Sequence, residues 1–398
     1  MKHFSIVGTF LITLLMCACS VEEPMTDSRD QSVQTDPNFV SLNEALEAAE
    51  SYFSGIYGSK TRSARKVSNV ELLNVRKTRG VDQEYGYYVV NYDNGSGFSL
   101  LSADRRRNAV YAISDEGSLN LADTIYNEGL NWYINDFLPV QGGVDRAVIK
   151  PDTTLHPISG DLYFYYTTCA PLLNGFMRRF DQGAPFNKYC FTEDGYKALV
   201  GCLPVAVSTF IGYNKWPYQL AGHSFNWDAM YADSNHDSWY RLFEIVGRPE
   251  YLNAKSKYGV SATSAYMSSA KSMLERTGYE NVQFKYFDID AAFDELSNSR
   301  LFIMYGDRLN NGQRVGHAWI IDGSSRRATR LAIPSTEAGH PVYRYEDFYH
   351  CIWGWGGKSN GFYLYSNKLG GVAHEYDADT SSPGNTYENL KILSGEKP

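Results

Sequence analysis

The sequence predicts an α+β protein with a small unit over residues 38–122 and a larger unit over 161–398. In the small unit, apolar residues recur at helical spacing over 39–54, and short strand-like segments bounded by turn residues follow. Beyond residue 160 the aromatic density and the turn pattern change, and the chain continues to its end without internal repeats. This mixture of helix and strand patterns, in a chain of 398 residues, favours two packed α+β units.

The composition is that of a globular protein. Apolar residues make up 43% of the chain and charged residues 21%, which excludes wholesale disorder. The formal net charge is −8, so no nucleic-acid partner is expected, because nucleic-acid binders carry a basic stripe or domain. Six cysteines in a chain of this length do not make a disulfide scaffold.

The N-terminus is typical of an exported protein. Lys2 precedes an apolar run over 4–16, which is shorter than the roughly 20 residues of a membrane-spanning helix and fits a signal peptide. Residues 15–20 look like a bacterial lipobox, so we expect residues 1–18 to be a lipoprotein signal peptide and Cys19 to be lipidated. The acyl chains would anchor the protein to the outer membrane, surface-exposed or released, and a secreted protein without lipid is the alternative. Residues 19–37 are polar and predict a solvated tether.

The small unit, 38–122, begins with a predicted helix. Ser41 is the expected N-cap of this helix, and Glu44 completes a capping box. Strands are predicted at 70–75, 85–92, 97–102 and 109–114, with a hairpin turn at 93–97. Residues 123–160 follow as a junction that contains a candidate helix over 124–137.

One cysteine of the larger unit lies where a loop enters a buried helix. Cys202 follows Gly201, and residues 204–213 are apolar at helical spacing, with Pro204 suited to the first turn. Peptide N–H groups and the helix dipole at such a position favour the thiolate and lower the pKa of the cysteine. The alternative is a buried, inert thiol.

Three further residues can complete a nucleophilic site around Cys202. Gln182 lies in a Gly-Pro-rich turn, and its side-chain amide can donate to an oxyanion. His317 begins a strand, and its imidazole can take a thiol proton and later protonate a leaving amine. Trp353 opens a Trp-Gly-rich segment whose indoles can shield an ion pair from water. Taken singly, Gln182 and His317 are more often surface or packing residues, so their order along the chain carries the prediction.

This order resembles that of the papain-like cysteine peptidases, and in detail that of the streptopain family. The motifs that carry the resemblance are Gly201-Cys202, Gly316-His317-Ala318-Trp319 and Trp353-Gly354-Trp355-Gly356-Gly357. Upstream, residues 86–91 and 97–104 resemble the inhibitory propeptide of the same family. The resemblance covers about 38–395. It implies a papain-like two-part catalytic domain, a helical part plus an antiparallel sheet, over 161–398, behind a small α+β propeptide domain.

The resemblance also implies a function. The chain would be a cysteine endopeptidase, made as a zymogen, that cleaves protein or peptide substrates and is inhibited by its own propeptide. The implied roles are Cys202 as nucleophile, His317 as general base and acid, Gln182 with the Cys202 backbone N–H as oxyanion hole, and Trp353 as a residue that orients and covers the imidazole. No cofactor and no metal are implied.

One departure from the family pattern keeps other functions open. Ile352 stands where the family has an asparagine that could hydrogen-bond the imidazole. A catalytically impaired binding or inhibitor protein is therefore one alternative, and an amidase or transpeptidase acting on cell-wall peptides is another. The remaining cysteines, Cys169, Cys190 and Cys351, have no CxxC spacing, which argues against structural zinc. In an exported chain two of them could form a disulfide.

Overall fold

The computed structural model describes residues 37–58, 65–73, 85–125, 127–138, 164–173, 175–233, 236–254, 257–310, 313–330, 342–371, 374–376 and 390–398. The expected signal peptide, Cys19 and nearly all of the tether lie outside these residues, as does most of the expected junction. Residues 38–398 form one compact unit rather than two separate ones. In the part of the chain described here, no helix has the length and apolar character needed to cross a membrane.

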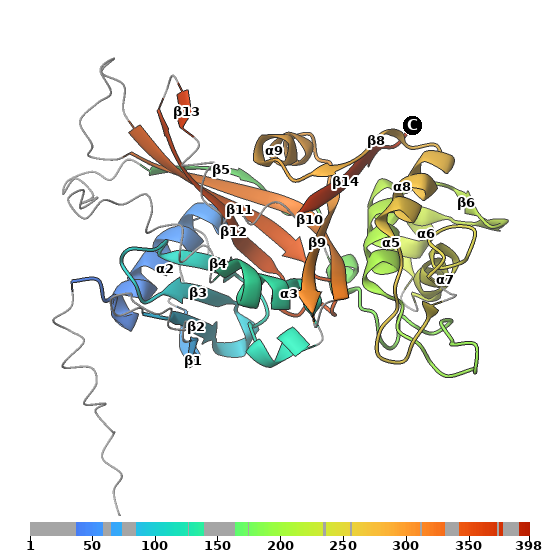
Figure 1. Ribbon diagram of the computed structural model, residues 1–398, viewed down its shortest axis with the longest axis horizontal. Helices are drawn as coiled ribbons and strands as arrows, with labels where there is room; N and C mark the ends of the chain where they lie inside the picture. Colours follow the sequence, from blue (N-terminus) through green and yellow to red (C-terminus); the bar gives the residue numbers. More distant parts are fainter. Residues whose placement is uncertain are drawn as a thin grey trace, which may run out of the picture. The chain divides into compact units, whose positions relative to one another are not determined.

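One large antiparallel sheet runs through this unit (Figure 1). Its strands follow the order β1-β2-β3-β4-β12-β11-β10-β9-β14-β8, with β13 on β12 and β5 on β10. The strands are Val67–Leu73 (β1), Tyr87–Tyr92 (β2), Phe98–Ser102 (β3), Val110–Ser114 (β4), Phe164–Cys169 (β5), Glu280–Tyr286 (β8), Phe302–Asn310 (β9), Gln313–Arg330 (β10), Val342–Ile352 (β11), Gly361–Gly371 (β12), His374–Tyr376 (β13) and Lys391–Glu396 (β14). A separate two-stranded sheet pairs Gln219–Leu220 (β6) with His223–Ser224 (β7).

Strands β1–β4 belong to the N-terminal unit (residues 38–138) and continue the sheet of the C-terminal unit (residues 164–398). β2 and β3 form the predicted hairpin around the turn Asp93–Gly95 (η2). β4 pairs with β12 through the partners Ile113↔Phe362 and Ala112↔Tyr363. Helix α2 (Leu42–Tyr57), with the predicted capping box at its N-terminus, buries one face against the sheet. The two units therefore share one sheet.

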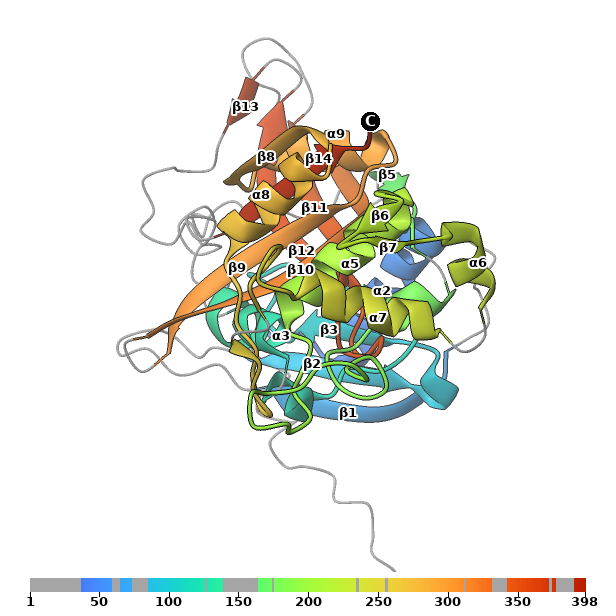
Figure 2. The same ribbon diagram turned by 90° about the vertical axis from the view of Figure 1, so that its right-hand side faces the viewer.

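The sheet separates two apolar cores. Successive residues of β10 alternate between them, because neighbouring side chains of a strand point to opposite faces. Trp319 and Ile321 belong to the core shared with the N-terminal unit, whereas Ala318 and Ile320 belong to the core of the helical part. The helices of the C-terminal unit are Gly175–Arg179 (η5), Cys202–Asn214 (α5), Trp227–Ala232 (α6), Asp237–Val246 (α7), Met267–Arg276 (α8) and Ile289–Ser297 (α9); Figure 2 faces α5–α8.

The N-terminal unit continues beyond residue 122, where the sequence placed its end. In place of one helix over 124–137, residues 121–137 form three short helical segments, Leu121–Ile125 (η3), Glu128–Trp132 (α3) and Tyr133–Phe137 (η4). The hydroxyl of Tyr133 donates to the carbonyl of Tyr111 at 2.8 Å and to that of Leu364 at 2.9 Å. These segments therefore pack between the two units, over the sheet.

A buried polar cluster also joins the two units. The hydroxyl of Tyr52, on α2, lies 2.8 Å and 3.0 Å from the two carboxylate oxygens of Glu346 on β11. Nη1 of Arg327, on β10, donates to Glu346 Oε2 at 2.7 Å and to the Tyr52 hydroxyl oxygen at 2.9 Å. Tyr52 therefore hydrogen-bonds both members of a largely buried ion pair in the C-terminal unit.

Tyr52→Phe is expected to lower the free energy of unfolding by about 1–3 kcal/mol, because a buried carboxylate loses a donor. Urea unfolding of the full chain measures this, with Cys202→Ala in every protein compared because the resemblance noted above predicts self-cleavage. Tyr196→Phe is the matched control, since Tyr196 is 66% exposed. Equal stability of the Tyr52→Phe and Tyr196→Phe chains would show that the cluster does not hold the units together.

Candidate active site

Cys202 is the first residue of α5, as the sequence predicted. Gly201 precedes it with φ 97°, a left-handed conformation that suits glycine and turns the loop into the helix. Every residue from Leu203 to Gly212 is buried, so α5 is fixed firmly in the core of the helical part. The thiol is thus held on a rigid helix end.

Strand β10 brings Ala318, the residue after His317, next to this thiol. The backbone N–H of Ala318, the residue after His317, hydrogen-bonds the sulfur of Cys202. Cys202 and Ala318 also line one small cavity with Ile352. His317 itself is 4% exposed. Residues more than a hundred positions apart in the sequence therefore meet at one point of the site.

The carbonyl of Trp353 fixes the imidazole of His317. His317 Nε2 lies 3.2 Å from this oxygen. Because a carbonyl oxygen only accepts, Nε2 carries the proton, which leaves Nδ1 with a lone pair that can accept one. The imidazole also stacks with the indole of Trp319, at 5.9 Å between ring centroids and 19° between planes.

Trp353 is held in place from several sides, directly after β11. Its indole Nε1 donates to the carbonyl of Ser359 at 2.9 Å, and its backbone N–H donates to Asn360 Oδ1 at 3.2 Å. Its ring packs 5.2 Å from the Trp319 ring. The sequence predicted that Trp353 orients the imidazole; the structure places its carbonyl, rather than its indole, on the imidazole nitrogen.

Gln182 lies in a loop that is tied to two other parts of the site. Its carbonyl accepts a hydrogen bond from the Val200 N–H at 2.8 Å, two residues before Cys202. Its neighbour Asp181 forms a backbone bridge with Trp355. The Gln182 side chain is buried at 5% exposure. Backbone contacts thus link the Gln182 loop to the segment before Cys202 and to the segment after Trp353.

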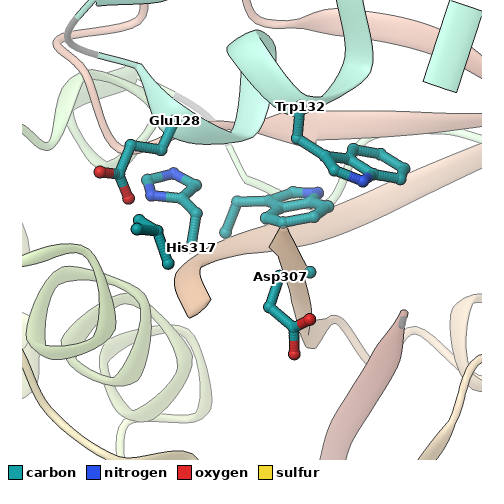
Figure 3. Close-up of a pocket in the computed structure, with 7 residues that line it drawn as sticks. Glu128, Trp132, Asp307 and His317 are labelled. Carbon is teal, nitrogen blue, oxygen red and sulfur yellow. The ribbon is translucent and has the colours of Figure 1, made fainter. Parts of the chain in front are cut away.

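Helix α3 of the N-terminal unit covers the site (Figure 3). Glu128 and Trp132, from α3, line a small cavity together with His317, Trp319 and Asp307. Gly129 packs so closely that a Cβ there would lie 2.6 Å from His317 Cδ2 and 2.6 Å from Trp353 Cε3. Only glycine allows this approach, so α3 sits directly on the imidazole.

The Cys202 thiol and the His317 imidazole are both neutral in this state, in which α3 packs on the site. Burial raises the pKa of the Cys202 thiol to about 11, and the nearby Glu128 carboxylate raises it further, while hydrogen bonds from backbone N–H groups oppose the rise. Burial lowers the pKa of His317 to about 4, against the hydrogen bond to Trp353. The sequence predicted a lowered thiol pKa from the helix N-terminus; in this structure desolvation outweighs that effect, so the expectation was wrong for the covered state.

Ile352, the departure from the family pattern, packs in the core of the helical part. It is 3% exposed and lines the cavity behind Cys202. The hydrogen bond that an asparagine side chain could give to the imidazole is replaced here by the Trp353 carbonyl. Loss of the asparagine therefore does not leave His317 without an orienting partner.

Ile352→Asn is expected to destabilise the protein by about 1–3 kcal/mol, because it buries an amide among apolar side chains. It should not raise kcat/KM on peptide substrates. Urea unfolding and steady-state kinetics measure the two effects, with Ile352→Val as the volume-reducing control. A stable Ile352→Asn protein with higher kcat/KM would show that the missing asparagine limits activity.

The other cysteines take no part in the site. Cys169, Cys190 and Cys351 are free thiols, as is Cys202, so the disulfide considered from the sequence is not formed. Cys351 is buried. Within the described residues, no group of three or more His, Cys, Asp or Glu side chains could hold a metal ion.

Sequence reasoning missed two groups that act on the site from the N-terminal unit, Glu128 and Gly129. Both fall in the segment assigned to the junction, and no motif marks either of them. The roles of Glu128 and Gly129 follow from the close packing of α3 against His317, and that packing exists only in the folded protein.

A cysteine at the start of a helix lies beside the strand residue that follows a buried histidine, and the N-terminal unit packs on that histidine. This arrangement fits a thiol hydrolase in a covered state. Comparison with known proteins identifies the family. Residues 180–363 match the Peptidase C10 family, and residues 37–136 match the Spi protease inhibitor family. The chain therefore carries a Peptidase C10 domain, of the streptopain family of cysteine peptidases, and an inhibitor-type propeptide domain ahead of it.

Individual relatives agree with this assignment. Streptopain of Streptococcus pyogenes is 23% identical over 381 residues, covering 83% of this chain and 86% of that protein. The thiol protease/hemagglutinin PrtT of Porphyromonas gingivalis is 26% identical over 302 residues, which make up 71% of this chain and 34% of that protein. This chain thus matches only about a third of the length of PrtT. A fragment of prointerpain A from Prevotella intermedia shares the fold with a TM-score of 0.51 and 18% identity, covering 83% of this chain and 99% of that one.

Proposed function

We propose that this protein is a self-inhibited cysteine endopeptidase in which Cys202 and His317 hydrolyse peptide bonds. The observation that carries the proposal is the position of His317: its Nε2 is fixed on the Trp353 carbonyl, and the next residue contacts the Cys202 sulfur. A base within reach of a nucleophile, itself oriented by a third group, is the arrangement that nucleophilic catalysis requires.

The geometry supports a two-step reaction. His317 Nδ1 takes the proton of the Cys202 thiol, and the thiolate attacks the substrate carbonyl to form a C–S bond. The oxyanion that develops accepts hydrogen bonds from the Gln182 amide and the Cys202 backbone N–H. The imidazolium then protonates the leaving amine as the C–N bond breaks. Water, deprotonated by His317, attacks the thioester and releases the acid and the thiol.

The N-terminal unit acts as the intramolecular inhibitor in this proposal. Helix α3 packs directly on His317, and its Glu128 carboxylate adds to the burial that raises the pKa of the Cys202 thiol. Burial also lowers the pKa of His317, so thiol and imidazole are both neutral in this state. The reactive thiolate and imidazolium are both disfavoured while α3 is in place. Removal of the N-terminal unit would expose the site to water and to the substrate.

The sequence supports a location outside the cytoplasm. Residues 1–18 would be removed as a signal peptide, Cys19 would carry the lipid anchor in the outer membrane, and residues 19–37 would be the tether. Mass spectrometry of the N-terminal peptide from membrane fractions tests this: a diacylated Cys19 is expected, and an unmodified N-terminus in the soluble fraction would overturn it.

The reaction class is tested with three kinds of substrate. The full chain, incubated under reducing conditions, is given unfolded proteins, short peptides and peptidoglycan fragments, and new termini are read by mass spectrometry. Internal cleavage of proteins, absent in the Cys202→Ala chain, is the expected result. Cleavage of peptidoglycan fragments alone would indicate an amidase or transpeptidase, and turnover of none of them would indicate a binding or inhibitor protein.

A further inference from the structure

A polar cavity of about 610 Å³ lies between the two units, apart from the cavities around Cys202 and His317. The C-terminal unit contributes three cationic side chains to it, Arg178, Arg179 and Lys358. The N-terminal unit contributes two carboxylates, Glu116 and Asp123. The charges on the two walls are thus opposite in sign, in a chain whose formal net charge is −8.

The basic wall is built on the same two loops that carry Gln182 and Trp353. These loops are joined by the Asp181↔Trp355 bridge and by a hydrogen bond from the Gly356 N–H to the Phe180 carbonyl at 3.0 Å. Asn360, which accepts from the Trp353 N–H, donates through Nδ2 to the Arg178 carbonyl at 3.0 Å. The cationic side chains are therefore coupled rigidly to the catalytic residues.

Arg178, one of the three cations, forms an ion pair with Glu116 of the N-terminal unit. Arg178 Nη1 lies 3.1 Å from Glu116 Oε1, while Arg178 Nε donates to the carbonyl of Leu173 at 2.6 Å, which fixes the guanidinium. Asp181, from the same unit as the basic wall, interacts electrostatically with Lys358. Among the described residues that line the cavity, this unit contributes three cations and no carboxylate, so the wall keeps a positive excess when the N-terminal unit leaves, even with Asp181 counted.

The chemistry of the reaction indicates which part of a substrate meets this wall. His317 must protonate the leaving amine, so the residues that follow the scissile bond leave the site beside the imidazole. The imidazole is fixed on Trp353, and the segment after Trp353 runs directly into Lys358 and Asn360. We therefore expect the substrate residues that follow the scissile bond to extend toward the polar cavity.

We propose that Arg178, Arg179 and Lys358 form a binding site for acidic side chains in the residues that follow the scissile bond, and that Glu116 occupies this site in the zymogen. The proposal rests on the proposed peptidase function and adds its substrate class. Exposed cations of this kind give modest, salt-sensitive selectivity.

Two quenched fluorescent peptides test it. Both carry the sequence at which the chain cleaves itself, and they differ only in Glu or Gln at the three positions after the scissile bond. The self-processed enzyme is expected to cleave the Glu peptide with a kcat/KM about three- to tenfold higher. The ratio of kcat/KM for the Glu peptide to kcat/KM for the Gln peptide should fall toward one in 0.5 M salt. It should fall in the same way in the double variant Arg179→Gln, Lys358→Gln.

Both substituted residues are exposed, and circular dichroism with thermal unfolding shows whether the double variant is folded. Lys285→Gln, an exposed lysine on β8, is the matched control and should keep the wild-type ratio. A wild-type ratio of one or less, or a ratio that the double variant leaves unchanged, would overturn the acidic-residue site. Failure of the peptidase function itself would look different, since neither peptide would then be cleaved.

Discussion

Substitution of Cys202 by alanine is expected to abolish peptide hydrolysis, with kcat/KM falling by at least about a thousandfold. The reason is that Cys202 is the nucleophile of the proposed covalent step, and the methyl group of alanine cannot replace a thiolate. Cleavage of a fluorogenic peptide by the processed enzyme measures the effect. Cys169→Ala is the matched control, because Cys169 is a free, partly exposed thiol outside the site, and it should retain activity. Equal activity of the two variants would remove Cys202 from the mechanism.

Alkylation of Cys202 by iodoacetamide at pH 7 is expected to be at least about 100-fold slower in the intact chain than in the urea-unfolded chain. Burial raises the pKa of this thiol to about 11, and each unit above the ordinary value removes about nine-tenths of the reactive thiolate. The rate in the intact chain should therefore rise about tenfold per pH unit up to that pKa. Peptide mass spectrometry of Cys202 measures the labelling.

The processed enzyme provides the comparison. Without α3 the thiol keeps its backbone N–H partners but loses the desolvation and the Glu128 carboxylate that raise its pKa, so Cys202 should label rapidly, at a rate that changes little with pH above neutrality. The Cys202→Ala chain confirms which peptide carries the label. Equal labelling rates in the intact and processed proteins would show that the N-terminal unit does not suppress the thiolate.

Features that depend on neighbouring residues were predictable from the sequence. The capping box of Ser41 and Glu44 and the hairpin around η2 involve residues within a few positions of one another, and both form as predicted. The start of α5 at Cys202 is also local, because Gly201 allows the required turn and an apolar helix follows. Each of these features is determined by short-range chemistry that the sequence displays directly.

Features that depend on distant parts of the chain were not predictable. The pairing of Ile113 with Phe362 joins the two units into one sheet, and no local pattern specifies it. The thiol pKa was misjudged because its largest cause is burial, in a site that Gly129 and its helix cover. The orientation of His317 by a backbone carbonyl is equally invisible, since every residue has a carbonyl and only the fold selects that of Trp353.

The most direct test of a self-inhibited Cys202 peptidase is the intact mass of the full chain during incubation under reducing conditions. The wild-type chain is predicted to lose a fragment containing the N-terminal unit, at a rate independent of protein concentration if each molecule cleaves itself. The Cys202→Ala chain should stay whole, and adding a trace of processed wild-type enzyme should convert it. Loss of the same fragment from the Cys202→Ala chain alone, at the wild-type rate, would contradict the account.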